Sequence, residues 1–195
     1  TLVLRPDFTP SVSRACATYF NPEKEVVSLC YTGNTFINNS SFRGRLKETT
    51  QMGVERMGDD SPEADAEILA MTVECLLATG LTEFQVSVGQ VDYYKAIFAQ
   101  TGMSQEEEEE LRELISQKNY FGVEELVKNK NMDKSLARVL SQLPQMFGST
   151  EVLEKAKSLT DNPQALKAVA RLEEIYELLK VYGYEKYVTF EIGRA

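Results

Sequence analysis

The 195-residue chain contains no histidine. This absence excludes Ser–His and Cys–His nucleophilic catalysis, and histidine metal ligands, from these residues. Any acid–base chemistry would have to use Asp, Glu, Lys, Tyr or Cys side chains. We therefore expect neither a metal site nor a bound cofactor.

Cysteine is also scarce. Cys16, Cys30 and Cys75 are odd in number, and no two of them have a C-x-x-C spacing. This usage indicates neither a zinc site nor a disulfide framework, and it favours a reduced, cytoplasmic compartment. All three lie in apolar sequence, so we expect them to be small buried side chains.

Positive charge and long apolar runs are lacking as well. There are 21 Lys and Arg against 30 Asp and Glu, a net charge of −9, whereas general nucleic-acid binders are usually basic. The one basic cluster, Arg43, Arg45 and Lys47, is large enough for a single phosphate or carboxylate. No apolar run approaches the roughly 20 residues that cross a bilayer, and no signal-peptide pattern opens the chain. We expect no nucleic-acid or membrane partner. Because the chain begins inside a predicted strand and without Met, we expect it to be a piece of a longer protein.

Strand and helix patterns are mixed over the first hundred residues. Alternating apolar residues predict strands, and a 3.6-residue period with Pro or Gly at the ends predicts helices. The strands are expected at 2–5, 26–36, 46–57, 84–88 and 187–192, and the helices at 10–20, 62–79 and from 163 to 182. Thr9 is the expected N-cap of the first helix, with Pro10 at its first position. Residues 103–181 look wholly helical, and the acidic run 106–110 is expected to be a solvated helix start.

These elements predict an α+β fold, in which helices flank a mostly antiparallel sheet and a helical insertion interrupts it. The expected organisation is a core of residues 1–102, a helical insertion of residues 103–181, and a return to the core over residues 182–195.

Within the strand expected at 46–57, side chains alternate between two faces. Gln51, Gly53 and Glu55 share one face, and Met52 and Val54 lie on the other. The missing side chain of Gly53 leaves room for a ligand between Gln51 and Glu55. A cation would need oxygen acceptors that converge in this way from one side.

Three sequence blocks resemble the histidyl-tRNA synthetases of class II. Residues 4–10, LRPDFTP, resemble their LRP-[ED]-x-T block, and residues 44–55, GRLKETTQMGVE, resemble their GRxRxFxQxGxE block in motif 2. The spacing from the first block to the second matches without a gap, and residues 61–67, SPEADAE, look like the helix that follows. Two long blocks in register are far more specific than a lone short motif.

The details of these blocks are most similar to the branch of that family that serves as the regulatory subunit of short-form ATP phosphoribosyltransferase. This resemblance implies a class II synthetase-like fold and a non-catalytic role in the first step of histidine biosynthesis. It also implies a short catalytic subunit as partner, self-association of the full-length protein, and allosteric feedback by L-histidine. The transferase chemistry would belong to the partner.

The resemblance also shows which residues differ. The synthetases have a motif 2 Arg after a Phe, where it holds reacting carboxylate and phosphate groups. Here Phe36 is followed by Ile37, and Asn39 stands where the motif has Glu. An isoleucine carries no charge and donates no hydrogen bond, so no catalytic residue is expected.

By contrast, the resemblance implies that the amino-acid pocket of the synthetases is retained. The residues that stand where the synthetases bind the histidine ammonium group are Asp7, Thr9, Gln51 and Glu55. The competing interpretation is that Glu55 pairs with Arg5 or Arg14 as scaffolding. Arg45 is a candidate anion ligand, or a support of the motif 2 loop. These alternatives stay open at the level of sequence.

Three functions stay open too. The chain is a regulatory subunit, a catalytic-core fragment of a true histidyl-tRNA synthetase, or a synthetase-like scaffold for another partner. Ile37 and Asn39 speak against the second, and the branch-specific details favour the first over the third. Fold alone would not decide between them.

Overall fold

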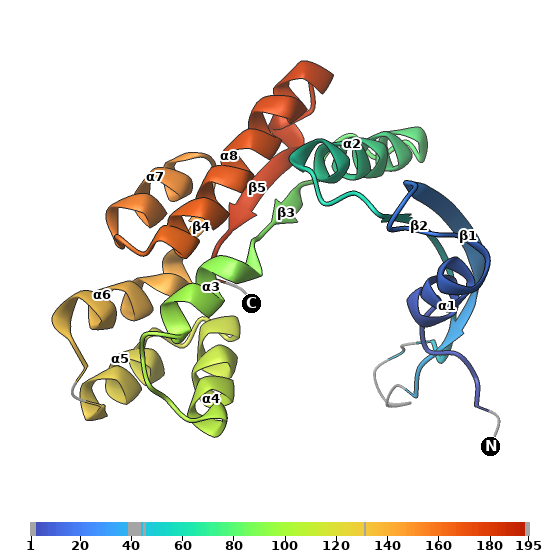
Figure 1. Cartoon of the computed structure of the whole chain (residues 1–195). Coiled ribbons are helices and arrows are strands. Elements are labelled where there is room, and N and C mark those ends of the chain that lie inside the picture. The colour runs from blue at the N-terminus through green and yellow to red at the C-terminus, as the bar shows by residue number, and fades with distance from the viewer. Residues whose placement is uncertain (1–2, 39–43, 45, 131, 194–195) are drawn as a thin grey trace. The chain divides into compact units, whose positions relative to one another are not determined.

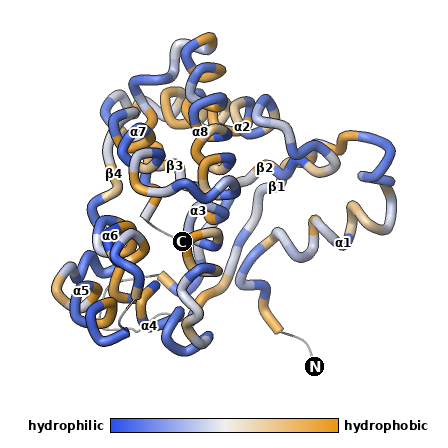
Figure 2. The backbone as a smooth tube through the Cα atoms, turned by 60° about the vertical axis from the view of Figure 1, so that its left-hand side comes forward, coloured by the Kyte–Doolittle hydropathy of each residue, from blue (hydrophilic) through white to orange (hydrophobic). Residues whose placement is uncertain are grey.

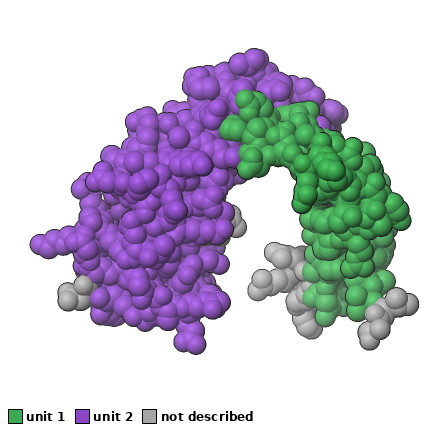
Figure 3. All heavy atoms as spheres, in the orientation of Figure 1, with its two compact units in different colours: residues 1–68 green, residues 69–195 purple. Residues whose placement is uncertain are grey.

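The computed structural model describes residues 3–38, 44, 46–130 and 132–193. The chain forms two compact units, Thr1–Ile68 and Leu69–Ala195, coloured separately in Figure 3. Both mix helices with strands, so the α+β class predicted from the sequence is confirmed. The division falls inside a helix, and the three-part organisation at 102/103 and 181/182 remains a prediction.

The first unit is built on two long strands, β1 (Val27–Phe36) and β2 (Glu48–Met57), which pair antiparallel from Val27↔Met57 to Phe36↔Glu48. Helix α1 (Thr9–Tyr19) precedes them, and α2 (Pro62–Ala78) follows (Figure 1). Pro62 is well placed at the start of α2 because the first turn of a helix does not need its amide. Acidic Glu63 and Asp65 lie in that first turn, where the helix dipole favours negative charge.

Helices predominate in the second unit. They are α3 (Val91–Phe98), α4 (Gln105–Ser116), α5 (Tyr120–Asn129), α6 (Lys134–Gln142), α7 (Glu151–Ser158) and α8 (Pro163–Tyr182). Short 3-10 turns occupy Leu143–Gln145 and Glu185–Tyr187. Along the helices, hydrophobic and hydrophilic stretches alternate (Figure 2), as expected when one face of each helix is buried.

Local signals fix the ends of these helices. Ser104 and Glu107 form a capping box at the start of α4, so the acidic run is a helix start as predicted. Asn162 caps α8, and Gly183 ends it in the left-handed conformation at φ 75°. Helix α8 packs against α3, and Tyr93, Leu172 and Leu179 are fully buried in this core.

The second unit also contains three short strands, β3 (Val86–Val88), β4 (Phe147–Gly148) and β5 (Val188–Glu191), in the order β3-β5-β4. Two expectations are wrong here. Strand β3 pairs with β5 in parallel, which the long intervening helical segment permits, because a parallel pair needs a crossover. Strand β4 also lies within the segment expected to be wholly helical, and at two residues it is too short to show an alternation pattern.

Two smaller expectations also need correction. Residues 3–5 form no strand, because Pro6 has no amide to continue a ladder, and Phe36 N donates a single hydrogen bond to Arg5 O at 2.9 Å. Of the cysteines, Cys16 is buried, but Cys30 and Cys75 are exposed free thiols. Among the described residues, no helix is both long enough and apolar enough to cross a membrane.

Candidate functional site

The candidate site lies on one face of the β1–β2 pair. The register sets Tyr31 opposite Gly53, Gly33 opposite Gln51, and Leu29 opposite Glu55. Since directly paired residues of an antiparallel ladder project to the same side, these six positions share one face. The face that the sequence predicted for Gln51, Gly53 and Glu55 therefore exists, and β1 adds an aromatic ring and a second glycine to it.

The two glycines make room for aromatic rings. A Cβ atom on Gly53 would lie 2.4 Å from the hydroxyl of Tyr31, and one on Gly33 would lie 2.6 Å from the ring of Phe8. Each ring thus covers a glycine. The two rings also stack on one another, with centroids 4.6 Å apart and planes 18° apart. Arg5 lies over the ring of Phe8, 4.4 Å from its centroid.

Beside this stack, Thr9 and Glu55 are in direct contact. The Thr9 hydroxyl donates to Glu55 Oε1 at 2.6 Å, which joins the start of α1 to β2. The sequence predicts Thr9 as the N-cap of this helix, but the cap is Phe8, and no side chain caps it. Thr9 is instead the first helical residue, so its hydroxyl is available to the strand.

Asp7 and Gln51 occupy different places around this contact. Asp7 Oδ1 accepts from the amides of Phe8 at 2.6 Å and Thr9 at 3.3 Å, so it orders the turn that presents Thr9. Gln51 is exposed on the Glu55 face of β2, with Gly53 between them. The structure therefore brings Thr9 and Glu55 together, while Asp7 orders Thr9 and Gln51 lies two strand positions beyond Gly53.

In the structure, Glu55 does not pair with Arg5 or Arg14, as the scaffolding alternative would require. Within the described part of the chain, Glu55 makes no ion pair with an arginine. Arg5 Nε donates instead to the carbonyl of Asn34 at 2.7 Å. Arg14 lines an open groove on α1 together with Pro10, Ser11, Ala15, Thr18 and Tyr19.

Ile37, which the resemblance sets in place of the synthetase arginine, lies directly after the end of β1. Ile37 N donates to Lys47 O at 2.9 Å, so the ladder continues one step beyond Phe36. The side chain of Ile37 is 49% exposed, which makes this position an apolar one at the surface. Asn39, and the candidate anion ligand Arg45, lie outside the described residues.

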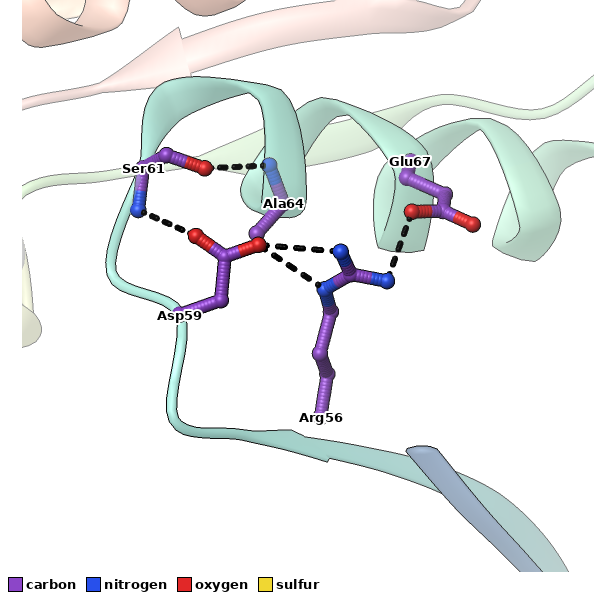
Figure 4. A network of polar contacts seen from close by, with 5 residues as sticks. All are labelled: Arg56, Asp59, Ser61, Ala64 and Glu67. Carbon is purple, nitrogen blue, oxygen red and sulfur yellow. Dashed lines mark hydrogen bonds and ion pairs between the residues drawn. The ribbon is translucent and has the colours of Figure 1, made fainter. Parts of the chain in front are cut away.

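A polar network that the sequence did not predict lies at the other end of β2 (Figure 4). Arg56 Nη2 contacts Asp59 at 2.9 Å, and Arg56 Nη1 contacts Glu67 of α2 at 2.9 Å. Hydrogen bonding from Ser61, and then from Arg56, lowers the pKa of Asp59 from 3.8 to about 2. The signal available in the sequence was Asp59, which lies two positions before Ser61 at a helix start. Arg56 lies three positions before Asp59.

Comparison with known proteins places the chain in a family. The sequence profile described as histidyl-tRNA synthetase matches residues 1–194. The chain belongs to the histidyl-tRNA synthetase family. Among its curated relatives, the ATP phosphoribosyltransferase regulatory subunits of Acetivibrio thermocellus and Clostridium acetobutylicum are 40% and 37% identical to it, each over 98% of this chain. These matches confirm the resemblance to regulatory subunits noted in the sequence blocks.

Two solved structures also match the chain. A regulatory subunit/histidyl-tRNA synthetase from Bacillus halodurans superposes with a TM-score of 0.84 at 30% identity, over 98% of this chain and 50% of that one. The chain spans about half the length of the curated relatives it matches, namely 46% and 48% for the two above. The ATP phosphoribosyl transferase HisG:HisZ complex from Thermotoga maritima matches with a TM-score of 0.71 at 18% identity, over 98% of this chain and 65% of that one, which shows a shared fold.

Proposed function

We propose that the chain is the synthetase-like part of a regulatory subunit of ATP phosphoribosyltransferase, and that its candidate site binds the ammonium group of L-histidine. The proposal rests on the curated relatives described above, which carry that function, and on one local observation. That observation is the contact between Thr9 and Glu55 beside Gln51.

The chemistry of the contact suits a cation. The Thr9 hydroxyl donates its hydrogen bond to Glu55, so the lone pairs of the Thr9 oxygen remain available as acceptors. An ammonium group donates three hydrogen bonds and carries a positive charge, which the Glu55 carboxylate complements. Gln51 adds an amide oxygen on the same face of β2. Asp7 would serve this site by ordering the turn before Thr9.

The site would bind without reacting. Ile37 stands where the synthetases have an arginine for the reacting phosphate and carboxylate, and its side chain offers no charge or donor. Histidine-dependent exchange of pyrophosphate into ATP by the full-length protein should therefore stay at the level of a no-enzyme control. Clear exchange would instead support the alternative, a catalytic-core fragment of a histidyl-tRNA synthetase. We keep Arg45 as a candidate anion ligand.

The partner we propose is the short catalytic subunit of ATP phosphoribosyltransferase, with self-association of the full-length regulatory protein. A protein that binds an end product without transforming it can act only through different affinities of its two states, which is how feedback works. The two exposed free thiols, Cys30 and Cys75, fit a reducing cytoplasmic location.

The decisive experiment mixes the full-length protein with the short catalytic subunit and follows phosphoribosyl-ATP formation with and without L-histidine. We expect the mixture to be more active than the catalytic subunit alone, and histidine to inhibit only the mixture. If the catalytic subunit alone is equally active and equally sensitive to histidine, the regulatory function is refuted.

A further inference from the structure

The Arg56 network lies one residue from Glu55, on the opposite face of β2. Arg56 uses its whole guanidinium group: Nε and Nη2 contact Asp59 Oδ2 at 3.3 and 2.9 Å, and Nη1 contacts Glu67 Oε2 at 2.9 Å. The side chains of Arg56 and Asp59 are only 23% and 21% exposed, so this pair is more shielded than an ordinary surface ion pair.

The same network organises the turn into α2 (Figure 4). Asp59 Oδ1 accepts from Ser61 N at 3.1 Å, and Ser61 Oγ accepts from Ala64 N at 3.2 Å. Together, these contacts link Arg56 near the end of β2 to the turn and to the first two turns of α2. The result is a closed ring of contacts that runs from Arg56 through the turn to Glu67 and back to the strand.

Gly58 provides a second contact that holds the turn. It adopts a positive φ of 85°, and a Cβ atom there would lie 2.4 Å from Pro22 O and 2.7 Å from Glu25 O. The turn therefore packs directly on the backbone that leads into β1. Because both the network and this packing hold the turn, the end of β2 has little freedom to shift along β1.

We propose that Arg56 is a positioning residue of the amino-acid site, which acts by fixing the backbone that carries Glu55. This inference rests on the proposed function for the identity of the ligand. Glu55 contacts Thr9 in the register that pairs it with Leu29, and the Arg56 network anchors the strand next to that position. The planar guanidinium group of Arg56 matters because the compact ammonium group of a lysine cannot make three separate contacts to two carboxylates.

The test compares variants of the full-length protein by calorimetric titration with L-histidine. Arg56→Gln should weaken binding roughly two- to thirtyfold, the range for residues that act at a distance from a ligand, and Arg56→Lys should recover part of that loss. Lys128→Gln is the matched control, because it removes an exposed ion pair with Glu124 at 3.5 Å in the second unit. It should bind histidine like the unmodified protein.

A double-mutant cycle separates positioning from general stability. If Arg56 acts through Glu55, Arg56→Gln should add little to the loss already caused by Glu55→Gln. An undiminished additional loss in the Glu55→Gln background would overturn the proposal, because it would show that Arg56 affects the protein by another route. Binding by Arg56→Gln at the unmodified level would overturn it as well.

Hydrogen exchange gives a readout that needs no ligand. In Arg56→Gln, the amides of residues 53–57 should exchange faster than in the unmodified protein, while Lys128→Gln should leave them protected. If the unmodified protein binds no histidine but these amides loosen, the proposed ligand is wrong and the positioning of Glu55 stands. Unchanged protection in Arg56→Gln would refute the positioning role whatever the ligand.

Discussion

Replacing Gly53 by alanine tests the arrangement of the candidate site most directly. The added methyl group would lie 2.4 Å from the Tyr31 hydroxyl and 2.8 Å from a ring carbon, far inside van der Waals contact. Tyr31 has to move, and because it stacks on Phe8, the stack has to move or separate with it. The perturbation is therefore small in the sequence and large at the site.

The magnitude follows from two opposed effects. Overpacking typically costs about 1–3 kcal/mol, and alanine in a strand interior is favoured over glycine by about 0.5–1 kcal/mol. Gly53→Ala should therefore destabilise the β1–β2 pair by up to roughly 2.5 kcal/mol net. In a Tyr31→Ala background the overlapping ring is gone, so the same change should be neutral or stabilising by up to about 1 kcal/mol.

Native-state hydrogen exchange of the β1 and β2 amides is the suitable assay, because it measures the free energy of opening for this part of the chain alone. The prediction is a change of sign between the two backgrounds. If Gly53→Ala costs the same with and without the Tyr31 ring, the close approach of ring and glycine is not what requires glycine here, and the reasoning fails.

Three further changes test other parts of the structure. Glu55→Gln should weaken L-histidine binding by about ten- to a hundredfold, the value of a lost charge-assisted hydrogen bond, whereas Glu48→Gln, on the opposite face of β2, should not; equal affinity in both variants would contradict the site. Because the pKa of Asp59 is depressed from 3.8 to about 2, its ionised carboxylate stabilises the fold. This contribution is fully present above pH 3.8 and is lost as the pH falls toward about 2. In Asp59→Asn, acid titration of the unfolding free energy should therefore be shallower over that window, and an unchanged slope would refute it. Tyr93→Phe removes a buried hydrogen bond of 3.1 Å to the carbonyl of Ala156, which still accepts from Leu159 N at 3.3 Å, so it should cost about 0.5–1.5 kcal/mol in chemical denaturation; an unchanged free energy of unfolding would show that the Tyr93 hydroxyl does not stabilise the core.

The parts of the fold that the sequence predicted well are those with local causes. Helix α8 begins at Pro163 after a capping Asn162 and ends at a left-handed Gly183, all within the signals of neighbouring residues. The parallel pairing of β3 with β5 joins Val86 to Val188, and nothing local in either three- or four-residue segment encodes the direction of a partner so distant in sequence.

The candidate site shows the same distinction. Strand alternation correctly placed Gln51 and Glu55 on one face, because the period of 2 is a property of the strand itself. The contact of Thr9 with Glu55 needed tertiary placement, and the local N-cap preference of Thr predicted a different role for that hydroxyl. Arg56 was missed because its partners become visible only when the turn after β2 brings Asp59 and Glu67 to the same guanidinium group.

The exposed thiol of Cys30 offers a chemical handle on this strand pair. Cys30 lies opposite Val54, the residue before Glu55, and on the face of β1 away from Tyr31 and Gly33. With Cys75 and any cysteines beyond residues 1–195 replaced by serine, and with Cys16 buried, a thiol-reactive fluorophore would label this position. Attached there, the dye touches none of the proposed ligand contacts, yet it sits across a single ladder step from the strand that carries them. Fluorescence of the labelled full-length protein could then follow histidine binding in real time, without a radioactive ligand or a coupled enzyme.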